Sequence, residues 1–145
     1  MPASGIKLVD ANVWLALAFD AHEHHPSAMQ WFSAQLEGTC AFCRVTQLAL
    51  LRHLTNSKIM GKFVQSQQTA WSSYDVFAKD PRVICLAEPP AIEVEFRSSS
   101  QSLTPALERW TDAYLAAFAR AIASQFVTFD RGFRSFPVLE VLLLS

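Results

Sequence analysis

Leu8-Val9-Asp10-Ala11-Asn12 is the stretch that decides the fold of this 145-residue chain. Residues 6–9 form a short apolar and β-branched run, which is typical of a buried strand, and helical spacing of apolar residues follows over residues 13–19. Parallel strands need crossover connections, usually helices, so a buried strand followed closely by a helix indicates a parallel sheet. The aspartate at this junction would lie at the carboxyl end of a strand, where open α/β sheets gather their ligands.

The same alternation of strand and helix continues along the whole chain. Apolar runs between turn residues predict four more strands, over residues 39–45, 83–86, 126–129 and 137–144. Helical periodicity and breakers predict helices over residues 26–38, 47–55, 64–78, 89–97 and 112–124. We therefore expect one domain over residues 1–145, with an α/β fold: a three-layer α/β/α sandwich around a mainly parallel central sheet.

Composition limits the classes of protein to which the chain can belong. Hydrophobic residues make up 51% and charged residues 17%, which argues against disorder. The net charge of −1 gives no support to strong general binding of nucleic acid, although a local positive surface would still serve a nucleic-acid substrate. No apolar run reaches the roughly 18 residues of a membrane span, and the first residues lack a signal-like apolar stretch, so we expect a cytoplasmic protein with no membrane partner.

Cys40 and Cys43 have the spacing of a Cys-x-x-Cys motif. In a strand, residues three apart point to opposite faces of the sheet. The two thiols are therefore predicted not to converge on a metal ion or on each other.

Two of the predicted strands end on an aspartate, at Asp10 and at Asp130 in Val127-Thr128-Phe129-Asp130. Two of the predicted helices follow a threonine, in Val45-Thr46-Gln47 and in Trp110-Thr111-Asp112. Threonine is a good residue to cap a helix, so we expect Thr46 and Thr111 as N-caps, with Gln47 and Asp112 as first helical residues.

Strand ends and the starts of the helices that follow them lie at the same edge of a right-handed α/β sheet. Asp10, Asp112, Asp130 and Gln47 are therefore predicted to approach one point. Crowded carboxylates raise one another's pKa, and a bound Mg²⁺ or Mn²⁺ removes that conflict. Such an ion activates a bound water and neutralises charge on phosphate, so the joint pattern indicates metal-assisted phosphate chemistry. Each of these residues taken singly also fits a structural role at a strand end or helix start.

The ordered segments 8–14, 46–56, 111–117 and 127–133 resemble the PIN-domain ribonucleases, in particular the VapC-type toxins of toxin–antitoxin pairs. The resemblance implies an endoribonuclease that depends on Mg²⁺ or Mn²⁺ and has a compact α/β/α fold. It also implies a homodimer, a small cognate antitoxin that inserts into the active site, and a structured RNA substrate, often transfer or ribosomal RNA. Carried over by position, the acidic metal site corresponds to Asp10, Asp112 and Asp130, with Asn12 and Thr128 as supporting residues.

Gln47 departs from this family pattern, because the family's second acid usually lies in the region of residues 46–48. We expect Gln47 to take that place as a neutral, outer-sphere partner, which would weaken the affinity for the metal. The main alternative function is a catalytically weak PIN-like module that binds RNA or an antitoxin. A small phosphotransfer enzyme or phosphatase fits less well, because none of the four lysines, at positions 7, 58, 62 and 79, is placed for that chemistry.

Overall fold

The computed structural model describes residues 4–145, and its centre is a sheet in which every pair of neighbouring strands is parallel. In these residues the sheet has five strands in the order β3-β2-β1-β4-β5. Their bounds are β1 Lys7–Val9, β2 Cys40–Phe42, β3 Val83–Cys85, β4 Gln125–Thr128 and β5 Val141–Leu143. The prediction of a mainly parallel sheet is confirmed.

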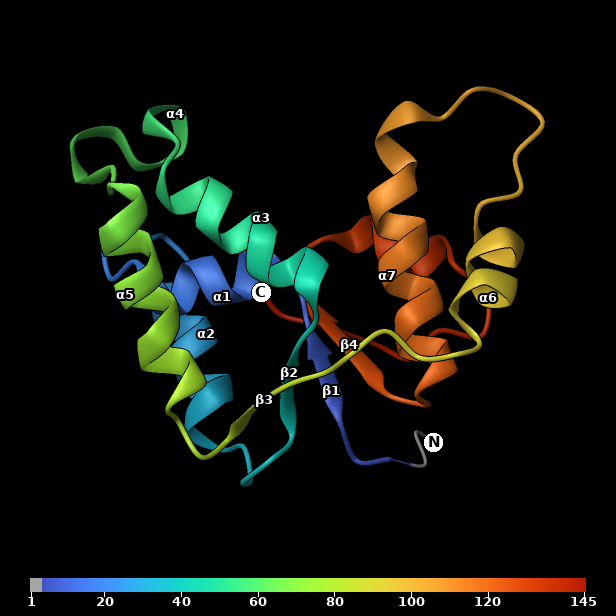
Figure 1. The fold of residues 1–145 in the computed structure, drawn as a ribbon, viewed down its shortest axis with the longest axis horizontal. Helices are drawn as coiled ribbons and strands as arrows, with labels where there is room; N and C mark the ends of the chain where they lie inside the picture. The colour runs from blue at the N-terminus through green and yellow to red at the C-terminus, as the bar shows by residue number, and fades with distance from the viewer. Residues whose placement is uncertain (1–3) are drawn as a thin grey trace.

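Helices cover both faces of the sheet and give the predicted three layers (Figure 1). One layer contains α1 (Ala11–Ala18), α2 (His25–Ser33), α3 (Arg44–Leu54) and α5 (Gln67–Ala78). The other contains α6 (Ile92–Ser99), α7 (Trp110–Ala121) and the 3-10 helix η3 (Arg131–Ser135). Three short helices lie between these elements: α4 (Ser57–Met60) and the 3-10 helices η1 (Gly61–Phe63) and η2 (Leu107–Arg109).

Strand alternation divides the core into two clusters, one on each face of the sheet. Val9 and Phe42 belong to the first cluster, where Trp14 stacks on Phe42 with ring centroids 4.0 Å apart. Leu8 and Ala41 belong to the second cluster, against α7. Cys40 lies in the first cluster and Cys43 in the second, both as free thiols, so the prediction that they point to opposite faces is confirmed.

Both threonine N-cap predictions are wrong, because each helix begins earlier than the sequence pattern indicated. β2 ends at Phe42 rather than at residue 45, and α3 begins at Arg44 with Cys43 as its N-cap. Thr46 is the third helical residue, and its hydroxyl accepts from the Cys43 N–H at 3.0 Å and donates to the Cys43 carbonyl at 3.1 Å. Thr46 thus stabilises the first turn of α3 as a residue within the helix rather than as its N-cap.

The start of α7 differs for another reason. Arg109 already has helical dihedral angles at the end of η2, so α7 begins at Trp110 and places Thr111 and Asp112 inside its first turn. Asp112 is therefore the third helical residue rather than the first.

Other boundaries shift by a few residues. α1 begins at Ala11 with Asp10 as its cap, and α5 begins at Gln67 with Ser66 as its cap. β5 is shorter than the predicted run 137–144, because Val138 adopts a left-handed backbone with φ of 57°. Along residues 4–145, no helix has the length and apolar character of a membrane span.

Candidate active site

Asp10 lies at the carboxyl end of β1 and caps α1, so both of its carboxylate oxygens are held in place. Oδ1 accepts from the Ala11 N–H at 2.7 Å, and Oδ2 accepts from Thr128 Oγ1 at 2.7 Å. Burial raises the pKa of Asp10 to about 6, although both hydrogen bonds lower it. The charges of Asp112 and Asp130 raise this pKa further, so the three carboxylates are electrostatic neighbours.

Thr128 joins the ends of β1 and β4 into one polar network. Its side chain is fully buried, and besides donating to Asp10 it accepts from Asn12 Nδ2 at 3.2 Å and from the Asp130 N–H at 3.0 Å. The Asn12 side-chain oxygen accepts from the Phe129 N–H at 3.3 Å. Asn12 and Thr128 thus fix the two strand ends on which Asp10 and Asp130 lie, and their supporting role in an active site stays a prediction.

Asp112 approaches from the first turn of α7, and Asp130 from the end of β4. Burial raises the pKa of Asp112, the charge of Asp130 raises it further, and Arg109 lowers it. Asp130 caps η3, where its Oδ1 accepts from the Gly132 N–H at 2.8 Å. A Cβ atom at residue 132 would lie 3.1 Å from this Oδ1, so glycine leaves room for the carboxylate. The neighbouring Arg109 was missed by sequence reasoning, since an arginine before a helix carries no specific signal.

These three carboxylates fit the chemistry of a hard divalent cation, which prefers oxygen ligands and keeps several waters. Their pKa pattern also fits, because the site contains mutually repelling negative charges that a cation would offset. Within residues 4–145, no three His, Cys, Asp or Glu side chains lie close enough to form a finished ligand cluster. The arrangement is therefore open, and it suits a cation held partly through water.

Gln47 has a different set of contacts from the three aspartates. Its Oε1 accepts from Arg44 Nη1 at 2.6 Å. It lines a pocket together with Tyr74 and Cys85, and this hydrogen bond points it to Arg44 rather than to an aspartate. The role of Gln47 as an outer-sphere metal partner stays a prediction.

Comparison with known proteins places this chain in a family. The model of the PIN domain family matches residues 7–139. Ribonuclease VapC41 of Mycobacterium tuberculosis is 38% identical over 143 residues, which cover 95% of this chain and 98% of the relative. The chain belongs to the VapC-type PIN-domain ribonucleases. The family resemblance predicted from the ordered segments 8–14, 46–56, 111–117 and 127–133 is thereby confirmed.

Solved structures of VapC-type proteins have the same fold. VapBC2 from Rickettsia felis, crystallised with a DNA fragment from its promoter, matches with a TM-score of 0.68 at 14% identity, over 97% of this chain and 99% of that chain. VapC20 of M. tuberculosis matches with a TM-score of 0.63 at 14% identity, over 90% of this chain and 95% of that chain. The PIN-like sandwich expected from the sequence is confirmed.

Proposed function

We propose that this VapC-type ribonuclease is a divalent-metal-dependent endoribonuclease that acts as the toxin of a toxin–antitoxin pair. The observation that supports the proposal is the approach of Asp10, Asp112 and Asp130 to one edge of the sheet, where the charges of Asp112 and Asp130 raise the pKa of Asp10 and the charge of Asp130 raises the pKa of Asp112. Hydrolysis of a phosphodiester bond in RNA is the reaction that this acidic edge serves in a member of this family.

Asp10, Asp112 and Asp130 are the residues that would hold Mg²⁺ or Mn²⁺. When bound, the cation supplies an acidified water and neutralises charge on the phosphate. Thr128 keeps Asp10 in place through its 2.7 Å hydrogen bond, and Asn12 keeps Thr128 in place. The raised pKa of Asp112 suits it to orient the attacking water and to accept a proton from it.

The substrate we propose is a structured cellular RNA, transfer or ribosomal. Support comes from VapC20 of M. tuberculosis, a sarcin–ricin loop cleaving toxin that shares this fold. The partner we propose is a small cognate antitoxin, which agrees with the VapBC assemblies from R. felis and nontypeable Haemophilus influenzae among the matching structures. We further propose that the protein works in the cytoplasm as a homodimer.

Cleavage of total RNA with and without EDTA tests the enzymatic proposal. We expect fragments in the presence of Mg²⁺ or Mn²⁺, and no fragments with EDTA or with the Asp112→Asn variant. Binding of RNA without metal-dependent fragments would favour the alternative, a catalytically weak binding module. Equal turnover by the wild type and Asp112→Asn would remove Asp112 from the mechanism.

A further inference from the structure

A second pocket, of about 520 Å³, opens at the carboxyl ends of β2 and β3 and has no part in the mechanism above. Its walls come from α3, α5, α7 and the segment after β3. The polar side chains that line it include Arg44, Gln47, Tyr74, Cys85, Glu88 and Tyr114.

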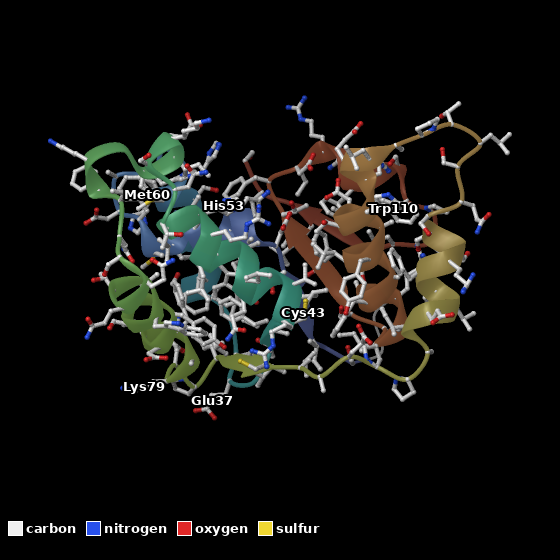
Figure 2. The ribbon with its side chains drawn as sticks, turned by 45° about the horizontal axis from the view of Figure 1, so that its top comes forward. Glu37, Cys43, His53, Met60, Lys79 and Trp110 are labelled. Carbon is white, nitrogen blue, oxygen red and sulfur yellow. The ribbon has the colours of Figure 1, made fainter. Side chains whose placement is uncertain are left out.

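This pocket begins close to Asp10. In the pairing of β1 with β2, Lys7 lies opposite Cys40 and Leu8 opposite Ala41. Continuing the register by two residues places Asp10 beside Cys43, which lines the pocket. Neighbouring strands are about 4.8 Å apart, so the pocket starts about one strand spacing from Asp10. Figure 2 shows Cys43 at the start of α3, and Trp110 at the start of α7, the helix that carries Asp112.

One wall of the pocket is lined by two pairs of polar side chains in contact. Arg44 Nη1 donates to Gln47 Oε1 at 2.6 Å. The Tyr74 hydroxyl lies 2.9 Å from Cys85 Sγ. Gln47 therefore serves the pocket wall by holding the Arg44 guanidinium, and its amide oxygen is suited to this contact as an acceptor.

The opposite wall offers an aromatic ring and an exposed acceptor. Tyr114 is half-buried, and its hydroxyl donates to Glu88 Oε2 at 2.6 Å. This hydrogen bond holds the Glu88 carboxylate in place and leaves Oε1 without a described partner among residues 4–145. Glu88 and Arg44 are both exposed, so a ligand can reach the carboxylate and the guanidinium from solvent.

We propose that this pocket binds the unpaired base of a nucleotide next to the scissile phosphate and so sets the sequence preference of cleavage. The inference rests on the proposed ribonuclease function. Unpaired bases are recognised by aromatic contact and by hydrogen bonds to their edges, and the pocket supplies both. Glu88 accepts N–H groups of the base, Tyr114 packs against it, and Arg44 faces the adjoining phosphate.

Equilibrium binding to the Asp112→Asn protein tests the pocket without cleavage of the probe. The probes are four fluorescein-labelled RNA hexamers, each of a single base, and the measurement is fluorescence anisotropy. We expect one hexamer to bind about tenfold more tightly than the weakest, which is the discrimination that a hydrogen bond to a charged group supplies. Addition of Glu88→Gln should remove or reorder this preference. The matched control is Glu93→Gln, an exposed glutamate on α6 that pairs with Arg97 outside the pocket, and it should retain the preference.

Equal affinity for all four hexamers, absence of RNA binding, or the same pattern in the Glu88→Gln and Glu93→Gln proteins would overturn the proposal. Metal-dependent cleavage by the protein with an intact Asp112 is a separate readout. Base-selective binding that depends on Glu88, in a protein that cleaves no RNA, would overturn the enzymatic function and retain the pocket. Metal-dependent cleavage without any base preference in binding would retain the enzymatic function and overturn the proposed role of the pocket.

Discussion

Asp10 is a buried carboxylate, and burial disfavours the charged form that binding of a cation would require. Its carboxylate is held by Thr128 and by the Ala11 N–H, yet burial and two neighbouring carboxylates make its charge unfavourable in the folded chain. The sequence could predict that Asp10 ends a strand, because the apolar run before it is plain. It could not predict which hydrogen bonds Asp10 makes, since its partner Thr128 lies 118 residues away.

The raised pKa of Asp10 predicts how the stability of the metal-free protein depends on pH. Because the pKa rises from 3.8 to about 6 on folding, the folded state binds this proton more tightly than the unfolded state. The resulting stabilisation is fully present below about pH 4 and is lost as the pH rises through about 6, with a limit of about 3 kcal/mol. Urea denaturation in EDTA should show a smaller loss of stability between pH 4.5 and 7.5 for Asp10→Asn than for the wild type. Identical profiles for the two proteins would contradict the assignment.

Thr128 gives a second prediction at the scale of single residues. Thr128→Val keeps the shape of the side chain but removes the donor to Asp10 and the acceptor for Asn12 and the Asp130 N–H. We expect the free energy of unfolding to fall by about 1–3 kcal/mol and RNA cleavage to fall about 10–100-fold. Urea denaturation and initial cleavage rates measure the two effects. Thr111→Val, at an exposed threonine beside Asp112, is the control, and equal effects of the two substitutions would argue against a special role for Thr128.

At the scale of elements, the sequence predicted the existence and order of most helices and strands. It misplaced the starts of α3 and α7, the two helices that carry Gln47 and Asp112. Thr46 and Thr111 have the chemistry of caps, yet the chain after β2 and after η2 is already helical when it reaches them. A shift of three residues turns a helix by most of one revolution, because one turn takes 3.6 residues. The position of Gln47 therefore depends on the residue at which α3 begins, and local helix propensity does not determine that residue.

The placement of Gln47 on α3 leads to a test of its role. If the role of Gln47 is to hold Arg44, Gln47→Glu should leave the affinity for Mn²⁺ unchanged within about twofold, because the new carboxylate would face Arg44. Isothermal titration calorimetry measures this affinity directly. Clearly tighter binding of Mn²⁺ by the variant would instead support the outer-sphere metal role predicted from the family pattern.

At the scale of the whole molecule, the parallel sheet brings together residues that are far apart in the sequence. β1 and β4 are adjacent in the sheet, so the carboxyl ends after which Asp10 and Asp130 lie are neighbours although most of the chain separates them. α7, which packs beside β4, carries Asp112 in its first turn. Figure 1 shows α7 and the sheet side by side. The alternation of strands and helices predicted this topology, because parallel connections leave few arrangements. The pocket beside Gln47 was not predictable, since its walls come from four separate elements.

Titration of the metal-free protein with Mn²⁺ by isothermal calorimetry tests the central claim most directly. We predict one site in the wild type, at least about tenfold weaker binding in Asp10→Asn, Asp112→Asn and Asp130→Asn, and wild-type affinity in the control Asp75→Asn, whose carboxylate is exposed on α5. Absence of Mn²⁺ binding by the wild type, or wild-type affinity in any of the three site variants, would contradict the claim that these aspartates hold one cation together.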